Sequence, residues 1–364
     1  MNHHDPALQL LIDRVQSARA AGAQLCIRGG GTKDFYGQLP QGEPLDTRVL
    51  EGTSSYEPTE LVVTTRCGTA LAELEALLAT KGQCLPFEPP HFGAGATVGG
   101  MVAAGLSGPS RAAVGAVRDH VLGATLLNGK GEVLSFGGQV MKNVACYDVS
   151  RLLAGSMGTL GVILEVSLKV LPVAPATLTL RMEMDQARAI TELNTWGGRA
   201  LPLNASAWWD GNLILRLRGA LAAVQAARAT IGGQVVEPQF ASPFWAGLRD
   251  HTDEFFAGAH AAVRGGAALW RLSLPSTAAP LALSGELLIE WGGAQRWLCS
   301  AMPAGAVRDA TTKAGGHATL FAAQDKSPGA FAPLQSPLDR IHRELKKAFD
   351  PAGIFNPGRL YPGL

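Results

Sequence analysis

Gly93-Ala94-Gly95-Ala96-Thr97-Val98-Gly99-Gly100 opens the stretch that decides the fold, and Gly155-Ser156-Met157-Gly158-Thr159-Leu160-Gly161-Val162-Ile163 closes it. Glycine loses more backbone entropy on folding than any other residue, so this density needs a structural reason. The usual reasons are tight turns with positive φ and backbone that approaches a ligand too closely for a Cβ atom. We interpret the stretch as a site where backbone amides hold phosphate groups.

A second glycine loop lies upstream. Residues 24–27 read as a short buried strand that runs directly into Arg28-Gly29-Gly30-Gly31-Thr32-Lys33. Backbone amides in such a loop can converge on an anion while the two flanking cations offset its charge. A plain flexible turn fits this hexapeptide equally well. Together, however, two such loops suit the two phosphates of one pyrophosphate.

Better-known nucleotide and catalytic motifs are absent. The first stretch fails the G-x-G-x-x-G pattern because Val98 stands where the third glycine is needed. Residues 123–130 are one residue too long for a P-loop, and Gly131 replaces its Ser or Thr. There is no G-x-S-x-G elbow and no H-E-x-x-H. His251 and Glu254 are interpreted as a solvated surface pair, so no metal site is predicted.

Composition narrows the class of protein. A length of 364 residues favours two or more domains, and 47% hydrophobic with 17% charged residues indicates a folded chain. A net charge of +1 without a basic block argues against nucleic acid as a partner. No apolar run is long enough for a transmembrane segment, and the first residues lack a signal peptide, so a cytoplasmic location is expected. Five cysteines without C-x-x-C indicate reduced thiols and no iron–sulfur cluster on this chain.

Hydrophobic periodicity predicts the main elements. Asp5 caps a helix over 7–21, and a strand over 61–65 with a helix over 69–81 suggests a second βαβ-like unit. Asn128-Gly129-Lys130-Gly131 joins a hairpin of strands 121–127 and 132–136. A strand over 162–170 alternates as if one face were buried, and Pro172 and Pro175 end it at a domain boundary.

The second half of the chain differs from the first half in amino-acid composition. All seven tryptophans lie beyond residue 175, which supports a separate α+β domain with helices over 185–195 and 221–231 and a strand over 213–217. Near the C-terminus, Ser336 is expected to cap a helix to about residue 349, with Leu338, Ile341 and Leu345 facing inward. The tail after it carries large apolar residues and is expected to dock.

Five motifs in order resemble the FAD-binding domain of the vanillyl-alcohol-oxidase/p-cresol-methylhydroxylase (PCMH) superfamily. They are 28–33, 96–100, 115–123, 142–148 and 155–163, and the tail Asp350-Pro351…Asn356-Pro357-Gly358-Arg359 is similar to that superfamily's C-terminal return to the flavin. The resemblance implies an α+β fold in which a two-subdomain PCMH-type FAD-binding domain (1–173) carries a smaller α+β cap (174–335) for substrate or partner. A C-terminal helix and tail (336–364) pack back on the FAD domain.

The resemblance also implies non-covalently bound FAD, because berberine-bridge-type relatives place the attachment histidine in the first loop where this chain has Lys33. Residues 28–33 and 96–100 are expected at the pyrophosphate and 155–163 along the adenosine half. The candidate cofactor-binding residues are Arg28, Gly29, Gly30, Gly31, Thr32, Lys33, Ala96, Thr97, Val98, Gly99, Gly100, Gly105, Gly108, Arg111, Gly115, Asp119, Lys142, Gly155, Gly158, Thr159, Gly161, Val162, Ile163 and Asn356. Lys142, Arg111 and Arg359 are unranked candidates for a cation near the flavin's N1.

The short middle domain and the motif over 142–148 resemble FAD-binding E subunits of bacterial glycolate oxidase. That resemblance implies a complex with a larger FAD-containing catalytic subunit and an iron–sulfur subunit, which oxidises glycolate to glyoxylate and passes electrons on. It also allows peripheral association with the inner face of the cell membrane through the complex. Cys146 departs from the family's usual glycine.

A further departure is the missing H-x-G-x-G-N motif with which superfamily members deprotonate 2-hydroxy acids; Gly315-Gly316-His317 offers a single histidine, interpreted as structural. Catalytic residues are therefore left unassigned. Two alternatives stay open: a self-sufficient FAD-dependent 2-hydroxy-acid or alcohol oxidoreductase, and a structural subunit with a vestigial flavin site.

Overall fold

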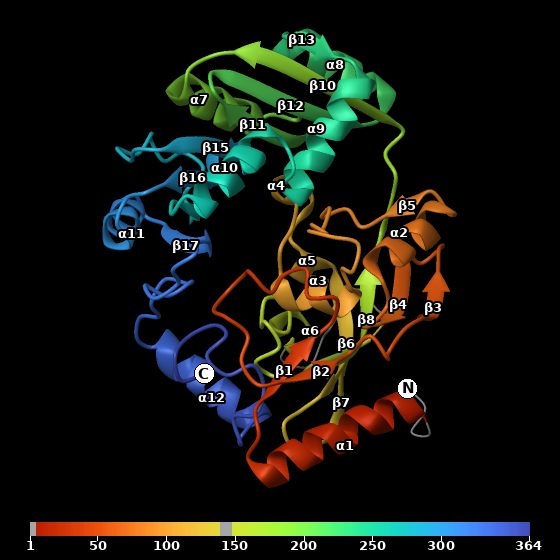
Figure 1. Cartoon of the computed structure of the whole chain (residues 1–364). Helices are drawn as coiled ribbons and strands as arrows, with labels where there is room; N and C mark the ends of the chain where they lie inside the picture. The colour runs from red at the N-terminus through yellow and green to blue at the C-terminus, as the bar shows by residue number, and fades with distance from the viewer. Residues whose placement is uncertain (1–4, 139–147) are drawn as a thin grey trace.

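The computed structural model describes residues 5–138 and 148–364. Figure 1 shows the first half of the chain gathered in the lower part, the strands β10 to β17 with their helices in the upper part, and the C-terminal helix α12 back beside the first half. The fold mixes helices with sheets, as the α+β prediction requires. None of the helices in the described part of the chain combines the length and the apolar character needed to cross a bilayer.

The first half is built from short elements around one sheet. Its elements are α1 (Pro6–Ala21), β1 (Leu25–Arg28), β2 (Glu43–Asp46), β3 (Thr53–Glu57), β4 (Val62–Arg66), α2 (Leu71–Ala79), β5 (Gln83–Cys84), α3 (Val98–Ala104), α4 (Arg111–Val114), α5 (Val117–His120), β6 (Val121–Leu127), β7 (Val133–Gly137), α6 (Val149–Leu152), β8 (Val162–Lys169) and β9 (Leu171–Pro172). Strands β3-β4-β8-β6-β7 form a five-stranded sheet, while β1-β2 and β5-β9 form separate pairs.

Helix α1 shows why the local sequence folds as it does. The Asp5 carboxylate accepts a hydrogen bond from Ala7 N at 2.9 Å, and Pro6 occupies the first turn, where its missing N–H costs nothing. Gly22 ends the helix in the left-handed conformation at φ 66°. Leu8, Leu11 and Val15 are buried along one face. The predicted helix and its cap are confirmed.

Two predictions about the first half are wrong. The expected βαβ unit after β4 does not form, because β4 pairs antiparallel with β3 and β8 while β5 pairs with β9 in another sheet. Strand β8 was predicted to have one buried face, but it is buried on both. Its Leu164 packs in the cluster that contains the α1 side chains, whereas Ile163 packs in the cluster formed with α2 and α3. The predicted hairpin of β6 and β7 is confirmed.

The second half is organised by an eight-stranded sheet in the order β13-β10-β12-β11-β15-β16-β14-β17. Its elements are β10 (Ala176–Glu183), α7 (Gln186–Gly197), β11 (Leu203–Trp209), β12 (Asn212–Gly219), α8 (Leu221–Ile231), β13 (Gln234–Val236), α9 (Pro238–Asp250), α10 (Glu254–Arg264), β14 (Ala268–Ser273), β15 (Glu286–Glu290), the 3-10 turn η1 (Trp291–Gly293), β16 (Gln295–Ser300), α11 (Ala304–Lys313) and β17 (His317–Ala322). The chain thus changes sheets between β8 and β10, across the prolines where the domain boundary is predicted.

Helix α12 (Leu338–Phe349) differs from its prediction. Pro337 stands at the N-cap without a side-chain hydrogen bond, so Ser336 does not cap the helix. Leu338 and Ile341 are about half exposed, whereas Lys346 is buried and Leu345 and Phe349 pack against the core of the first half. The apolar spacing therefore identified the helix and the inward position of Leu345, but it was wrong for Leu338 and Ile341.

The tail after α12 docks through a buried ion pair. Lys346 Nζ lies 2.7 Å from Asp350 Oδ2 and also donates to the carbonyls of Thr159 and Phe355. Asp350 accepts in turn from the amides of Ile354 and Phe355. Every donor in this cluster has an acceptor nearby, which is the condition under which a buried ion pair is tolerated. The expected docking of the tail is confirmed.

Replacing Asp350 by Asn should loosen this docking, because the Lys346 ammonium would stay buried without its carboxylate. We expect opening of the tail to become easier by about 3 kcal/mol, which is roughly a hundredfold faster amide exchange. Hydrogen–deuterium exchange of residues 350–356 measures this. Asp339→Asn is the matched control, since it removes the exposed Arg343–Asp339 pair on the same helix and should change exchange by less than about fivefold. Equal effects of the two substitutions would contradict the assigned role of Asp350.

Candidate cofactor site

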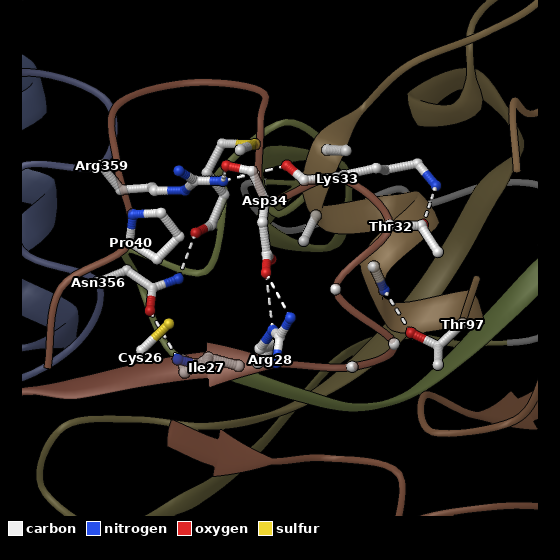
Figure 2. Close-up of a pocket in the computed structure, with 17 residues that line it drawn as sticks. Cys26, Ile27, Arg28, Thr32, Lys33, Asp34, Pro40, Thr97, Asn356 and Arg359 are labelled. Carbon is white, nitrogen blue, oxygen red and sulfur yellow. Dashed lines mark hydrogen bonds and ion pairs between the residues drawn. The ribbon is translucent and has the colours of Figure 1, made fainter. Parts of the chain in front are cut away.

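A narrow groove lies at the end of β1, where the buried strand runs into the glycine loop 28–33. Its volume is about 90 Å³. Segments far apart in the sequence meet there, as Figure 2 shows: the first glycine loop, Thr97 of the second loop, and Asn356 and Arg359 of the tail. Of the predicted cofactor-binding residues, those that line the groove are Arg28, Gly29, Gly30, Gly31, Thr32, Lys33, Thr97, Gly100 and Asn356.

The two glycine loops touch each other through their backbones. A Cβ atom on Gly30 would collide with the Gly95 carbonyl oxygen, and one on Gly29 would collide with the Thr97 side chain. Gly31 adopts φ 73° beside the Arg28 guanidinium. These positions therefore exclude side chains for reasons of contact and conformation, which leaves bare main chain along the groove.

The second loop is shaped by the helix that follows it. Thr97 Oγ1 accepts from Gly100 N at 3.2 Å and caps α3, while the amides of Val98 and Gly99 are bonded to Thr69 and Cys67. Ala96, Val98 and Gly99 thus pack toward α2 and β4 and do not line the groove. Only Thr97 and Gly100 of this loop face it.

In the third glycine stretch, residues 155–163, the first half reaches the groove. Met157 lines the groove, and the Gly158 position is tight because a Cβ would meet Asn356 Nδ2. Val162 and Ile163 lie in β8 inside the core, and Gly161 sits against β6. The placement of this stretch along a nucleotide stays a prediction.

Several other residues that were predicted to bind the cofactor lie away from the groove and make contacts within the fold. The Gly108 carbonyl accepts from Trp291 Nε1, and Asp119 caps α5 by accepting from Ala116 N next to Gly115. Gly105 ends α3 with φ 66° against Gly155. Their assignment to the cofactor remains untested. Lys142, like Cys146, lies outside the described residues.

The structure separates two of the three unranked candidate cations, Arg111 and Arg359, by their distance from the groove. The Arg111 guanidinium stacks 4.5 Å from the centroid of the Trp291 ring, away from the groove. Arg359, in contrast, lines the groove and is 6% exposed. Its Nη2 donates to the carbonyls of Lys33 and Asp34, and its buried Nη1 has no partner in the described part of the protein. A buried donor without an acceptor is costly unless a ligand supplies one.

Lys33 is a second cation suited to an anionic ligand. Its Nζ donates to the His91 carbonyl and to Thr32 Oγ1. Burial lowers the pKa of Lys33 to about 8, and the negative charge of Asp250 offsets only part of this shift. Arg28 is instead engaged with Asp34 at 2.7 Å. Lys33 and Arg359 are thus the cations whose charges an incoming phosphate would balance.

The tail residue Asn356 fixes the groove's floor. Its Oδ1 accepts from Ile27 N at 2.7 Å, and its Nδ2 donates to the Met157 carbonyl at 2.6 Å. One amide therefore ties β1, the third glycine stretch and the tail together. The tail motif indicated Asn356, and it also made Arg359 a candidate cation. Met157 was not assigned, because a methionine side chain carries no phosphate signal.

His251 and Glu254 do not form the surface pair expected from their spacing. His251 terminates α9 in the left-handed conformation and is buried, with its ring stacked on Phe256 at 3.7 Å, while Glu254 begins α10. Burial lowers the pKa of His251 well below its usual range. No group of three or more metal-binding side chains occurs among residues 5–138 and 148–364.

Bare main chain, two under-compensated cations and an unpartnered guanidinium N–H fit a pyrophosphate. Comparison with known proteins agrees with this geometry. A family model described as "FAD binding domain" matches residues 9–137. The chain is 47% identical to the glycolate oxidase subunit GlcE of Escherichia coli (strain K12) over 356 residues, which cover 98% of both chains. It is 30% identical to the glycolate oxidase subunit GlcD of Bacillus subtilis (strain 168) over 162 residues, or 44% of this chain and 33% of that protein.

Among solved structures, an alkyldihydroxyacetonephosphate synthase superposes with a TM-score of 0.62 at 16% identity, covering 96% of this chain and 74% of that one. At this identity the likeness concerns the fold alone. It extends over both sheets, because almost the whole chain is aligned. The α+β fold is thereby supported over almost the whole chain.

Gly30→Asp should abolish FAD binding, because it places a carboxylate and a side chain where the loops touch and a phosphate is expected. The affinity should fall by about a hundredfold or more, measured by fluorescence titration of the apoprotein with FAD. Gly305→Asp is the control, since nothing lies near that position in the first turn of α11 and an acid there is favourable. Retained FAD binding in the Gly30 variant would remove the first loop from the site.

FAD affinity should also depend on pH through Lys33. The free protein's Lys33 has a pKa of about 8, and a bound phosphate would raise it, so affinity should be nearly constant up to about pH 7 and fall as pH rises through 8 to 9. The fall approaches about tenfold per pH unit. Titrations at pH 7, 8 and 9 test this with Lys33→Met, which should bind weakly without the pH dependence. Lys81→Met, at an exposed position, should behave as the parent protein does, and a flat profile of the parent would contradict the role of Lys33.

Proposed function

We propose that this chain, which belongs to the family of the glycolate oxidase subunit GlcE, is the FAD-binding subunit of a glycolate oxidase complex. Its task in that complex is to take part in the oxidation of glycolate to glyoxylate and in electron transfer through its flavin. The observation that carries the proposal is the 47% identity over 98% of both chains. Because the match spans the cap and the tail as well as the first half, it concerns the whole arrangement and not the cofactor domain alone.

The residues of the groove divide the binding of FAD among them. Bound FAD supplies the ability to accept two electrons from an organic substrate and to release them to an acceptor. The backbone of Gly29, Gly30 and Gly31 approaches the pyrophosphate, and Gly100 of α3 also lines the groove. Lys33 and Arg359 balance the charge. Attachment is non-covalent, as Lys33 takes the place of a linking histidine.

Oxidation of the substrate is assigned to the complex as a whole. The chain lacks the histidine motif of the hydroxy-acid oxidases, and His317 at the start of β17 is exposed. A larger FAD-containing subunit of the GlcD type is therefore the proposed site of glycolate oxidation, with an iron–sulfur subunit carrying electrons onward. Association with the inner face of the cell membrane would then be a property of the complex.

The visible spectrum of the purified chain tests the proposal. The chain alone should show a flavin band that persists on anaerobic addition of glycolate and bleaches when the partner subunits are added. Bleaching of the isolated chain by glycolate would instead make it a self-sufficient oxidase. A protein that neither carries nor takes up FAD would be a structural subunit. Lactate and ethanol, added separately to the assembled complex, are the substrate controls.

A further inference from the structure

A cavity in the cap lies between helix α9 and the strands β10, β12 and β13, which Figure 1 shows together in the upper part of the molecule. Its volume is about 320 Å³, within the range of sites for small molecules. Its lining residues are all different from those of the groove at the glycine loops. The cavity is therefore a place apart from the proposed cofactor site.

The walls of this cavity follow from the register of the sheet and the spacing of the helix. Thr177 and Thr179 of β10 pair with Arg218 and Arg216 of β12, so the four side chains stand on one face of the sheet. Trp245 Nε1 on α9 donates to Thr179 Oγ1 at 3.0 Å and ties the helix to that face. The helix lines the cavity through residues three or four apart, which are Pro238, Ala241, Ser242, Trp245, Ala246 and Arg249.

Two arginines of β12 share one carboxylate at this cavity. Glu88 of the first half lines the cavity, and its carboxylate accepts from Arg216 Nη2 at 2.6 Å and from Arg218 Nη1 at 3.3 Å. Burial lowers the pKa of Arg216, because the attraction of Glu88 offsets only part of the desolvation. The two guanidiniums together therefore keep an excess of positive charge.

A third guanidinium, that of Arg249 on α9, also lines the cavity. Its Nε and Nη2 donate to Asp250 Oδ2, at 3.1 and 2.7 Å. Glu75 adds a weaker attraction for Arg249, but it lines a neighbouring cavity and is hydrogen-bonded to His91. Among the residues that line this cavity, three arginines are thus opposed by the single carboxylate of Glu88.

One terminal nitrogen of each guanidinium is free to bind a ligand. Arg216 Nη1, Arg218 Nη2 and Arg249 Nη1 make no hydrogen bond within residues 5–138 and 148–364. Arg216 is only 4% exposed, and its guanidinium lies over the Trp245 ring at 4.9 Å from the centroid. A donor with so little access to water gains most from an acceptor on a ligand. Helix α9 adds the positive end of its dipole, since Pro238 on the cavity wall stands in its first turn without a side-chain cap.

The other half of the lining is apolar. Trp245 belongs to it, together with Leu178, Val235, Val236, Pro238, Ala241 and Ala246. An inorganic anion would leave these surfaces in contact with water, while an apolar ligand would leave guanidinium N–H groups without acceptors. A carboxylate matches the fork of an arginine through two parallel hydrogen bonds. The lining thus favours a carboxylate that carries a short carbon chain.

We propose that this cavity binds a small aliphatic carboxylate, whose charged group pairs with Arg216 and Arg218 and whose carbon chain lies against Trp245. Because Glu88 comes from the first half and the arginines from the cap, the site lies where the two halves meet. The inference goes beyond the proposed function and does not rest on it, since no residue of the groove takes part.

Titration calorimetry of the purified protein, with the FAD it carries, tests the class of ligand. Butyrate should bind saturably, and about tenfold more tightly than butyramide, which lacks the charge, and than inorganic phosphate, which lacks the chain. Equal affinities for butyrate and butyramide would overturn the role of the arginines, and tighter binding of phosphate would overturn that of the apolar wall. Absence of saturable butyrate binding would overturn the proposal as a whole. A protein that binds butyrate without FAD would leave this inference standing while the proposed function fails.

Two substitutions test the place of binding. Arg218→Gln removes a half-buried guanidinium and leaves the Arg216–Glu88 pair, whereas Ala246→Trp fills the cavity from an exposed position on α9. Each should weaken butyrate binding by about tenfold or more. Arg181→Gln on β10 and Ala226→Trp on α8 are the matched controls, because both positions are exposed and outside the cavity, and they should change the affinity by less than about threefold. Parental affinity in the Arg218 or the Ala246 variant would overturn the placement, and either one decides it if the other does not fold.

Discussion

The docking of the C-terminal tail is the constraint on which the groove depends. Lys346 and Asp350 form a buried ion pair whose remaining hydrogen bonds are made by the backbone at Thr159, Ile354 and Phe355. This cluster fixes the tail so that Asn356 reaches Ile27, at the point where β1 becomes the glycine loop. Without the pair, bare glycine backbone would have little to hold it, since glycine itself makes no side-chain contacts. Part of the order of the loop is thus supplied from the other end of the chain.

The sequence predicted the glycine loops, the hairpin of β6 and β7, and the helices α1 and α8 because each has a local cause. Asp5 caps α1 through its own side chain, and Gly22 ends it by its own conformation. Such features do not depend on distant residues. For the same reason Gly29, Gly30 and Gly31 could be proposed as a phosphate loop before any three-dimensional structure was considered.

The features that the sequence did not predict depend on which distant segment packs against each face of a helix or strand. Leu338 and Ile341 follow the same helical spacing as buried residues, yet they are half exposed. Helix α12 turns Lys346 inward instead, because its buried partners lie in the tail and at Thr159. Strand β8 reads as half-buried until α1 is placed on its second face. His251 looks like a surface residue in the sequence, whereas the aromatic cluster around it comes from four separate segments. Periodicity records amphipathicity but not which face meets a partner.

The segment that follows the first glycine loop links the cofactor site to the cap. Arg359 of the tail holds the carbonyls of Lys33 and Asp34, while Lys326 and Arg271 of the cap hold the Gly37 carbonyl and the Tyr36 hydroxyl. Gln38 closes the arrangement by bonding to the carbonyls of Arg359 and Lys326. A ligand that orders this segment would therefore also favour the seated cap and tail, because the same hydrogen bonds serve both, and by linkage a seated cap would favour the ligand. Cofactor binding and the joining of the two halves are, on this geometry, parts of one equilibrium.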